Sequence, residues 1–123
     1  TAVPGASRYF EQSVVTYSNA AKVAWLGVPE ALLAEHGAVS DPVARAMASG
    51  IRARAGADVG IGVTGVAGPD GGTADKPVGT VVVAVALRES VTSRTLHLLG
   101  YREQIRSQSA QAALDLVRRI LTP

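Results

Sequence analysis

The pattern of hydrophobic and polar positions in the first third of the chain predicts one strand and two short helices. Residues 12–18 (QSVVTYS) are rich in β-branched side chains and predict a first strand. Residues 19–26 predict a helix with Asn19 as its N-cap, because an asparagine side chain can accept a hydrogen bond from a free amide of the first turn. Residues 29–37 begin with proline and end with glycine, which is typical of a second short helix.

Two longer helices are predicted, one in the middle of the chain and one at its end. Residues 41–55 begin with an Asp-Pro pair, and Val43, Met47 and Ile51 recur every four positions on one face. A last amphipathic helix is predicted from Tyr101 onward. Its apolar stripe consists of Ile105, Ala112, Leu116 and Ile120.

Three further strands are predicted over residues 58–64, 79–87 and 91–99. Residues 79–87 are apolar almost throughout, which favours a central strand covered on both faces. The first two predicted strands are joined through helices and should run parallel, whereas a short turn makes the last two an antiparallel hairpin. This order of elements predicts an α/β fold, a three-layer α/β/α sandwich with a mixed, mainly parallel sheet.

The start of the chain resembles the end of a helix. The chain begins with Thr1, and the sequence TAVPG is typical of a helix that stops at its proline and glycine. We expect residues 1–123 to form a single domain that lacks its first strand and helix, although an ordinary processed N-terminus would look similar. A sheet face left uncovered in this way would favour a homo-oligomer.

Composition narrows the classes of function. The chain has 47% hydrophobic residues but one Phe and one Trp, so its core must consist of Ala, Val, Leu and Ile. The absence of cysteine excludes disulfides, thiolate metal sites and a cysteine nucleophile, and it fits a reducing, cytoplasmic location. No run approaches about 18 apolar residues, so we expect no membrane span. A net charge of +2 without a basic patch argues against a nucleic-acid partner.

A glycine-rich stretch is the most distinctive feature of the sequence. Residues 62–80 (GVTGVAGPDGGTADKPVGT) contain six of the thirteen glycines and follow a predicted strand directly. The spacing matches neither a P-loop nor a dinucleotide fingerprint. Such a loop is either a structural crossover or a cradle for a ligand at the carboxyl end of a strand, and its length and glycine content favour the cradle. Its candidate ligand-binding residues are Thr64, Gly65, Gly68, Gly71 and Gly72.

A second group of candidates stands at the end of the first predicted strand. Tyr17, Ser18 and Asn19 follow the strand, and Lys22 lies one helical turn further on. A buried lysine with a lowered pKa can act as a general base, whereas a lysine on a solvated helix face has no chemical role. The sequence pattern leaves both interpretations of Lys22 open.

The remaining charged candidates are less specific. Arg102 and Arg106 are four residues apart at the start of the last predicted helix and could bind an anion such as a phosphate, or could serve solubility. Lys76, within the glycine-rich stretch, is either a ligand contact or, as we favour, a solvated charge. His36 and His97 have no partners at metal-ligand spacing, so we treat both as structural and expect no metal site.

Several segments together resemble the CinA C-terminal domain family. This family includes bacterial nicotinamide mononucleotide deamidases, the PncC proteins, and the domain that ends the competence/damage-inducible protein CinA. The similarity runs from VPGAS near the start to GYREQIR in the last helix and so covers nearly the whole chain. The segments that resemble the family are TYSNAAK (16–22), LGV (26–28), HGAVS (36–40), AMASG (46–50) and TGVAGPDGGT with KPVGT (64–80).

The resemblance implies an amidohydrolase of NAD salvage. Its substrate would be the small-molecule nucleotide nicotinamide mononucleotide, and its products nicotinic acid mononucleotide and ammonia. No cofactor and no metal would be needed, since in active members a serine is the nucleophile and a lysine activates it. Domains of this family commonly self-associate, which also points to a homo-oligomer.

The resemblance assigns roles to residues of this sequence. Lys22 matches the family's activating lysine, and Tyr17 matches a tyrosine that shapes the pocket. Ser7 of VPGAS matches a serine near the substrate, and Thr64 matches the threonine before the Gly-Pro turn. Asn19 belongs to the same TYSNAAK segment as Lys22 and is a candidate substrate contact.

The resemblance also assigns the two arginines, but one functional segment of the family is not found among these residues. Arg102 matches an arginine expected on the phosphate side, with Arg106 as its rival for that role. The family's nucleophile lies in a Glu-Ser-x-Thr-Gly-Gly segment upstream of VPGAS, and the 123 residues contain no such segment. Ser7 belongs to a different motif and does not replace that nucleophile. The alternative function is therefore a non-catalytic nucleotide-binding or interaction module of the CinA type.

Overall fold

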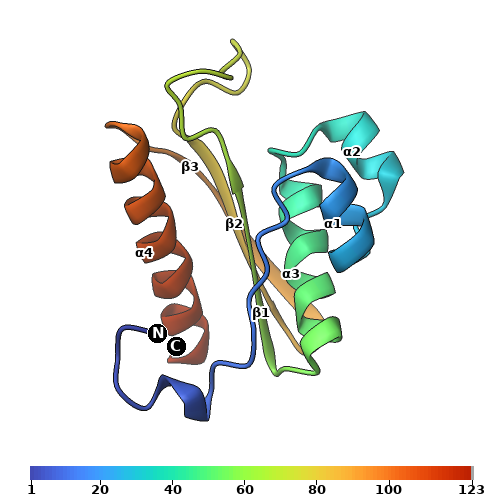
Figure 1. Ribbon diagram of the computed structural model, residues 1–123, viewed down its shortest axis with the longest axis vertical. Coiled ribbons are helices and arrows are strands. Elements are labelled where there is room, and N and C mark those ends of the chain that lie inside the picture. Colours follow the sequence, from blue (N-terminus) through green and yellow to red (C-terminus); the bar gives the residue numbers. More distant parts are fainter. Residues whose placement is uncertain (123) are drawn as a thin grey trace.

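A three-stranded antiparallel sheet forms the centre of the computed structural model, which describes residues 1–122 (Figure 1). Its strands lie in the order β1-β2-β3, so that β2 pairs with both neighbours. Gly62 of β1 lies opposite Ala84 of β2, and Ala84 lies opposite Ser93 of β3. The strands are β1 (Val59–Gly65), β2 (Thr80–Leu87) and β3 (Ser90–His97). The predicted central position of the most apolar strand is confirmed.

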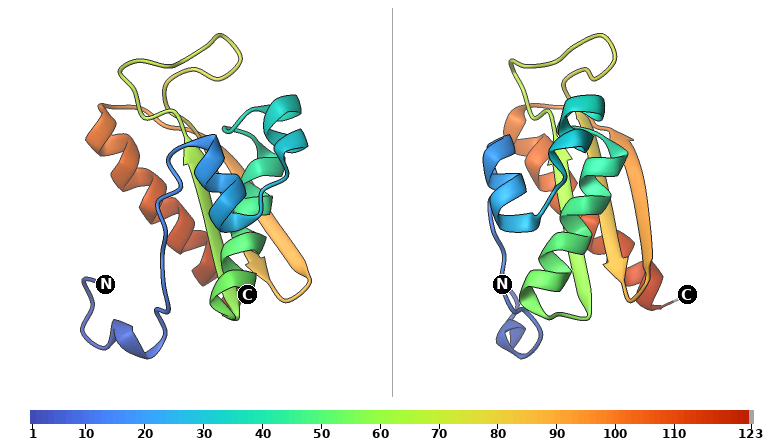
Figure 2. Two further views of the ribbon diagram at one scale, coloured as in Figure 1. Left: turned by 45° about the vertical axis from the view of Figure 1, so that its right-hand side comes forward. Right: turned by 90° about the vertical axis from the view of Figure 1, so that its right-hand side faces the viewer.

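Helices lie on both faces of this sheet (Figures 1 and 2). Helix α3 packs against one face and is contacted on its outer side by α1 and α2, while α4 packs against the other face. The helices are the short 3-10 helix η1 (Ala6–Arg8), α1 (Asn19–Leu26), α2 (Glu30–His36), α3 (Asp41–Ala55) and α4 (Arg102–Leu121). The predicted α/β class is confirmed. Within the described residues, no helix combines the length and apolar character that crossing a membrane requires.

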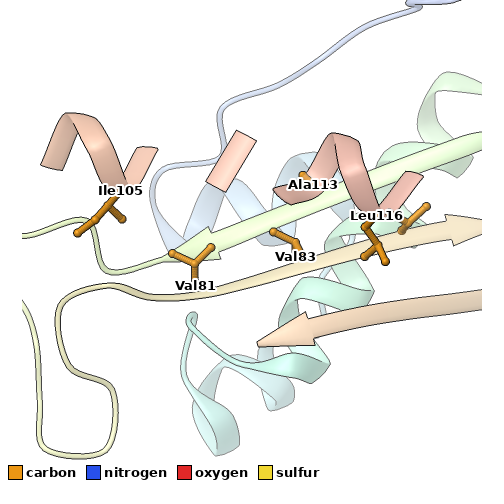
Figure 3. Close-up of a cluster of buried hydrophobic side chains, with 6 residues drawn as sticks. Val81, Val83, Ile105, Ala113 and Leu116 are labelled. Atoms are coloured by element: carbon orange, nitrogen blue, oxygen red, sulfur yellow. The ribbon is translucent and has the colours of Figure 1, made fainter. Parts of the chain in front are cut away.

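The alternation of side chains along β2 creates two separate apolar clusters. Because successive strand residues point to opposite faces, one set of β2 residues faces α4 and the other faces α3. The cluster on the α4 side consists of Val81, Val83, Val85, Ile105, Ala113 and Leu116 (Figure 3). The cluster on the α3 side consists of Val82, Ala84, Ala86, Ala44 and Ala48. Valines fill the first cluster, whereas alanines let α3 approach the sheet closely.

Glycines in β1 bring α3 closer still. A Cβ atom on Gly60 would meet the backbone of Ala48 and would lie 2.6 Å from the Cβ of Arg52. A Cβ atom on Gly62 would meet the carbonyl of Ala44 and would lie 2.8 Å from the amide nitrogen of Ala48. Only glycine fits at these positions because the backbone of α3 occupies the space of a side chain.

Two predictions about the sheet were wrong for the part of the chain that the structure describes. Residues 12–18 are extended but form no strand, since none of their backbone groups bonds to β1. The sheet is not mainly parallel, because the segment predicted to run parallel to β1, residues 12–18, is not part of it, and both strand pairs that form are antiparallel. A β-branched run becomes a strand only where a neighbouring strand accepts its backbone hydrogen bonds.

The structure also corrects two details of the helices. Ser18, not Asn19, is the N-cap of α1, because its Oγ accepts a hydrogen bond from the amide of Ala21 at 3.0 Å. In α4 the buried stripe passes through Ala113 in place of Ala112, which is only half-buried. The predicted helix over residues 41–55 has the bounds of α3 and is confirmed.

Asp41, the first residue of α3, connects this helix to β3. Its carboxylate accepts hydrogen bonds from the hydroxyl of Ser93 and from Nε of Arg45, the latter at 2.7 Å. Arg45 also donates to the carbonyl of Val91 at 2.8 Å. The Ser93 hydroxyl and the Arg45 guanidinium hold the pKa of Asp41 below its usual range. The interaction therefore stabilises the fold only while this carboxyl group is ionised.

We expect Asp41→Asn to lower the free energy of unfolding by about 1 kcal/mol near neutral pH, since the lost ion pair is half-exposed. Because the folded state has the lower pKa, this contribution is present above the usual carboxyl range and disappears as the pH falls through the folded pKa. Urea denaturation should show a smaller difference between variant and wild type at pH 3 than at pH 7. Asp75→Asn, on the exposed loop, is the control, and an equal difference at both pH values would contradict the assignment.

Candidate functional site

A pocket of about 620 Å³ lies at the carboxyl end of β1. Three segments that are distant in the sequence surround it: the extended residues 14–17, the first turns of α4, and the loop of residues 66–79 that connects β1 to β2. We call this connection the glycine loop, and it projects from the top of the sheet in Figure 1. The pocket thus lies where the sequence predicted a ligand.

Lys22 is the buried ionisable group of this pocket. It lies on α1, and its Nζ donates hydrogen bonds to the backbone carbonyls of Thr16 at 2.8 Å and Tyr17 at 3.4 Å. Only 6% of the residue is exposed. Burial lowers the pKa of Lys22, because desolvation penalises the ammonium form. Among the described residues no carboxylate lies within ion-pair distance to counter this effect.

This environment suits proton transfer. A lysine whose pKa is lowered can accept a proton from a nucleophile and return it to a leaving group. The two carbonyl acceptors fix the position of the amine, whereas a solvated helix lysine would be free to move. Lys22 is therefore not a solvated helix lysine, and its role as a general base stays a prediction.

Thr64 lines the same pocket as Lys22 but has a structural contact of its own. It is buried near the end of β1, and its Oγ1 donates to the carbonyl of Ala38 at 2.9 Å. This hydrogen bond ties the end of β1 to the connection between α2 and α3. The hydroxyl can still accept a hydrogen bond from a ligand, because donation uses only its proton.

Two arginines reach the pocket from α4. Nη1 of Arg102 donates to the carbonyl of Gly68 at 2.8 Å, and Nη2 lies 3.4 Å from the hydroxyl of Tyr17. Arg106 lines the same pocket one helical turn further on and is exposed. No hydrogen bond or ion pair joins Arg106 to another residue of the described chain.

The charges around the pocket favour an anionic ligand. Lys22, Arg102 and Arg106 line it, and Asp70 is the one carboxylate among the lining residues. Asp70 forms no ion pair within residues 1–122, so it does not neutralise either arginine. Cationic groups in a concave site attract phosphate or carboxylate groups and orient them.

The glycine loop offers further donors. Gly68 and Gly71 have φ values of +79° and +92°, which side chains with a Cβ rarely adopt. The backbone N–H groups of Ala67, Gly68, Asp70 and Gly71, all residues of the pocket wall, donate to no acceptor in the described part of the chain. Free amides of this kind, on a loop with positive φ values, can bind the oxygen atoms of a ligand.

The predicted role of Lys76 requires correction. Its Nζ donates to the carbonyl of His36 at the end of α2, so it is not a solvated charge. The contact ties the glycine loop to α2. The imidazole of His36 itself lies 3.7 Å from Glu35, and His97 is exposed on β3. Within residues 1–122 no group of three potential ligand side chains could hold a metal ion.

The structure brings most of the predicted site residues together. The predicted residues that line the pocket are Tyr17, Asn19, Lys22, Thr64, Gly65, Gly68, Gly71, Arg102 and Arg106. Gly72 belongs to the glycine loop but not to the pocket wall, and Ser18 serves as a helix cap. Ser7 is exposed in η1, and η1 lies at the other end of β1 from the glycine loop (Figures 1 and 2).

Asp70 is the pocket residue that sequence reasoning missed. The signal was present, because it is the first charged residue of the glycine-rich stretch and lies between two of its glycines. The other missed residues are uncharged: Val14, Val15, Thr16, Ala38, Val39, Met47, Val63, Val66 and Ala67. Their place on the wall follows from the packing of β1 against α3 and from the path of the loop, which the hydrophobic pattern does not specify.

Comparison with known proteins identifies close relatives. The family model of the CinA C-terminal domain matches residues 1–121. A competence-damage inducible protein of Symbiobacterium thermophilum is 55% identical over 130 residues, which cover 98% of this chain and 30% of that protein. A CinA-like protein of Gemmatimonas aurantiaca is 55% identical over 119 residues, which cover 97% of this chain and 28% of that protein. The chain therefore spans less than a third of the length of these curated relatives.

Solved structures show the same fold. The competence damage-inducible protein A of Klebsiella pneumoniae has a TM-score of 0.93 and 36% identity, and the match covers 98% of this chain and 74% of that one. A competence or damage-inducible protein of Enterobacter asburiae also has a TM-score of 0.93, with 30% identity, covering 98% of this chain and 76% of that one. The chain belongs to the CinA C-terminal domain family.

Proposed function

We propose that this domain binds nicotinamide mononucleotide and provides the general base for hydrolysis of its amide group. One observation is central to the proposal. Lys22, a buried lysine with a lowered pKa, lies on the wall of a pocket that also contains Arg102 and Arg106. The pocket thus combines a proton acceptor with cationic groups that suit a phosphorylated substrate.

In the proposed reaction the neutral amine of Lys22 accepts the proton of a serine hydroxyl, and the serine oxygen attacks the amide carbon. Lys22 then protonates the leaving nitrogen, the carbon–nitrogen bond breaks, and ammonia departs. Water hydrolyses the resulting ester, which gives nicotinic acid mononucleotide and restores the serine. The serine would belong to the family's Glu-Ser-x-Thr-Gly-Gly segment, which lies outside the 123 residues.

The remaining pocket groups would orient the substrate. We assign the free amides of the glycine loop to substrate oxygen atoms, and Tyr17 and Asn19 to the sides of the nicotinamide ring. Ser7 keeps its proposed place near the substrate only if the segment around η1 rearranges in the complete protein. The complete protein would act in the cytoplasm as a homo-oligomer.

A non-catalytic nucleotide-binding module is the second candidate. It is favoured by the lack of a serine nucleophile at the pocket: no serine among residues 1–122 lines the wall, and the hydroxyl of Thr64 already donates its proton to the carbonyl of Ala38. Such a module would use the same cationic residues and free amides to bind a nucleotide without hydrolysing it.

Ammonia release from nicotinamide mononucleotide by the full-length protein, as its gene encodes it, tests both candidates. We expect turnover that depends on enzyme concentration and persists in the presence of a metal chelator. Calorimetric titration with the product, nicotinic acid mononucleotide, measures binding separately. Binding without turnover would favour the module, and the absence of both would overturn both candidates. Heat-denatured protein is the control.

A further inference from the structure

We infer that the two pocket arginines have different roles: Arg106 binds the phosphate group of the substrate, and Arg102 is a positioning residue. In this assignment Arg102 holds Tyr17 and the glycine loop in place around the pocket. The inference rests on the proposed function, because it names the part of the site that recognises a phosphorylated ligand. It assigns separate roles to Arg102 and Arg106, which the sequence left as alternatives for phosphate binding.

The guanidinium of Arg102 already has two partners. One nitrogen donates to the Gly68 carbonyl at 2.8 Å, and the other reaches the hydroxyl of Tyr17 at 3.4 Å. These partners are 34 and 85 residues away in the sequence, so one side chain joins three segments of the pocket wall. The planar fork of arginine allows this, because its two terminal nitrogens donate in different directions.

The acceptor at Gly68 makes the Arg102 contact difficult to give up. Gly68 is buried, and the hydrogen bond to its carbonyl is itself partly buried. If Arg102 turned towards a phosphate, it would leave this carbonyl without a partner and would release the glycine loop from α4. An unmade hydrogen bond at a buried carbonyl is costly, so the existing contact favours a fixed Arg102.

Arg106 forms no comparable hydrogen bonds within the described part of the chain. It lies four residues after Arg102 and so projects from the same face of α4, and it lines the same pocket. Its five N–H groups donate to no acceptor among the described residues, and neither Glu103 nor Asp70 forms an ion pair with it. An arginine that is free to turn can bind two phosphate oxygens at once without breaking a contact in the protein.

The amides of the glycine loop lie in reach of the same ligand site. Ala67, Gly68, Asp70 and Gly71 line the pocket together with Arg106, and their N–H groups are free within the described chain. Arg102 controls these donors indirectly, since it holds the carbonyl of Gly68 and hence the path of the loop. The geometry therefore gives Arg106 a direct contact with the anion and Arg102 an effect on where the amides point.

The test compares Arg106→Gln, Arg102→Gln and Arg102→Lys in the full-length protein, with Arg94→Gln on the exposed face of β3 as the matched control. The probes are inorganic phosphate, measured by calorimetric titration, and hydrogen exchange of residues 66–79. We expect Arg106→Gln to weaken phosphate binding by about tenfold or more without changing exchange in the loop. Arg102→Gln should raise loop exchange, and Arg102→Lys should not restore it, because lysine has one donor nitrogen and the two contacts are made by two separate nitrogens of the guanidinium.

Kinetics provide a second readout. With nicotinamide mononucleotide, Arg106→Gln should raise KM and leave kcat nearly unchanged, whereas Arg102→Gln should lower kcat. With nicotinamide riboside, which lacks the phosphate, Arg106→Gln should lose much less kcat/KM relative to the wild type than it loses with nicotinamide mononucleotide.

The outcomes separate this inference from the proposed function. If the wild type binds phosphate but does not hydrolyse nicotinamide mononucleotide, the deamidase assignment fails, while phosphate binding and loop exchange still decide the roles of the arginines. Loss of phosphate binding in Arg102→Gln without a change in loop exchange would overturn the inference. Equal losses of binding in Arg102→Lys and Arg106→Gln, or a wild type that binds no phosphate, would also overturn it.

Discussion

Replacement of Gly62 by alanine is expected to lower the free energy of unfolding by about 2–3 kcal/mol. The added Cβ would meet the carbonyl of Ala44 and lie 2.8 Å from the amide nitrogen of Ala48. Both are backbone atoms of α3, so no side-chain rotation can relieve the overlap, and the helix must move away from β1. Alanine would otherwise stabilise a strand interior by roughly 0.5–1 kcal/mol over glycine, so a net loss indicates the packing conflict.

Urea denaturation followed by circular dichroism measures this change. Ser49→Ala, on the exposed side of α3, is the matched control and should change stability by less than about 0.5 kcal/mol. The double variant Gly62→Ala with Ala44→Gly should be no more stable than Gly62→Ala, because the overlap involves the backbone of Ala44 and not its methyl group. A Gly62→Ala variant as stable as the wild type would show that α3 can shift without cost.

The helices and the central strand could be predicted because their signals are local. The Asp-Pro pair and the spacing of Val43 and Met47 define α3, and the uninterrupted apolar run of β2 matches its burial on both faces. Sheet pairing is different, because it depends on which other segment accepts a strand's hydrogen bonds. Residues 12–18 have the composition of a strand, yet nothing in the described chain pairs with them.

The candidate site, like the fold, could be predicted only in part. The sequence predicted the glycine loop, Lys22 and the two arginines, because each stands next to the end of a strand or the start of a helix. It could not predict that Lys76 contacts the carbonyl of His36 or that Arg102 contacts that of Gly68. Every residue offers a backbone carbonyl, so the sequence holds no information about which one a distant side chain will reach.

Lys22→Met is expected to reduce turnover of nicotinamide mononucleotide by about 10²–10⁴-fold, the usual contribution of a general base. Methionine has nearly the same volume as lysine but cannot accept a proton. Because burial lowers the pKa of Lys22, the rate of the wild type should rise with pH below the usual range of lysine titration. The residual activity of the variant should lack this rise, which initial rates of ammonia release across a pH series would show.

The same titration should be visible in stability, which gives a readout independent of catalysis. The folded state has the lower pKa, so between that pKa and the usual lysine value the unfolded chain binds more protons, and stability rises with pH. This rise should be absent from Lys22→Met. Lys22→Arg is the matched control: it keeps a cation that can donate to the carbonyl of Thr16 but does not lose its proton, so it too should be inactive. Turnover by Lys22→Arg above a tenth of the wild-type rate would mean that Lys22 acts by its charge and not as a base.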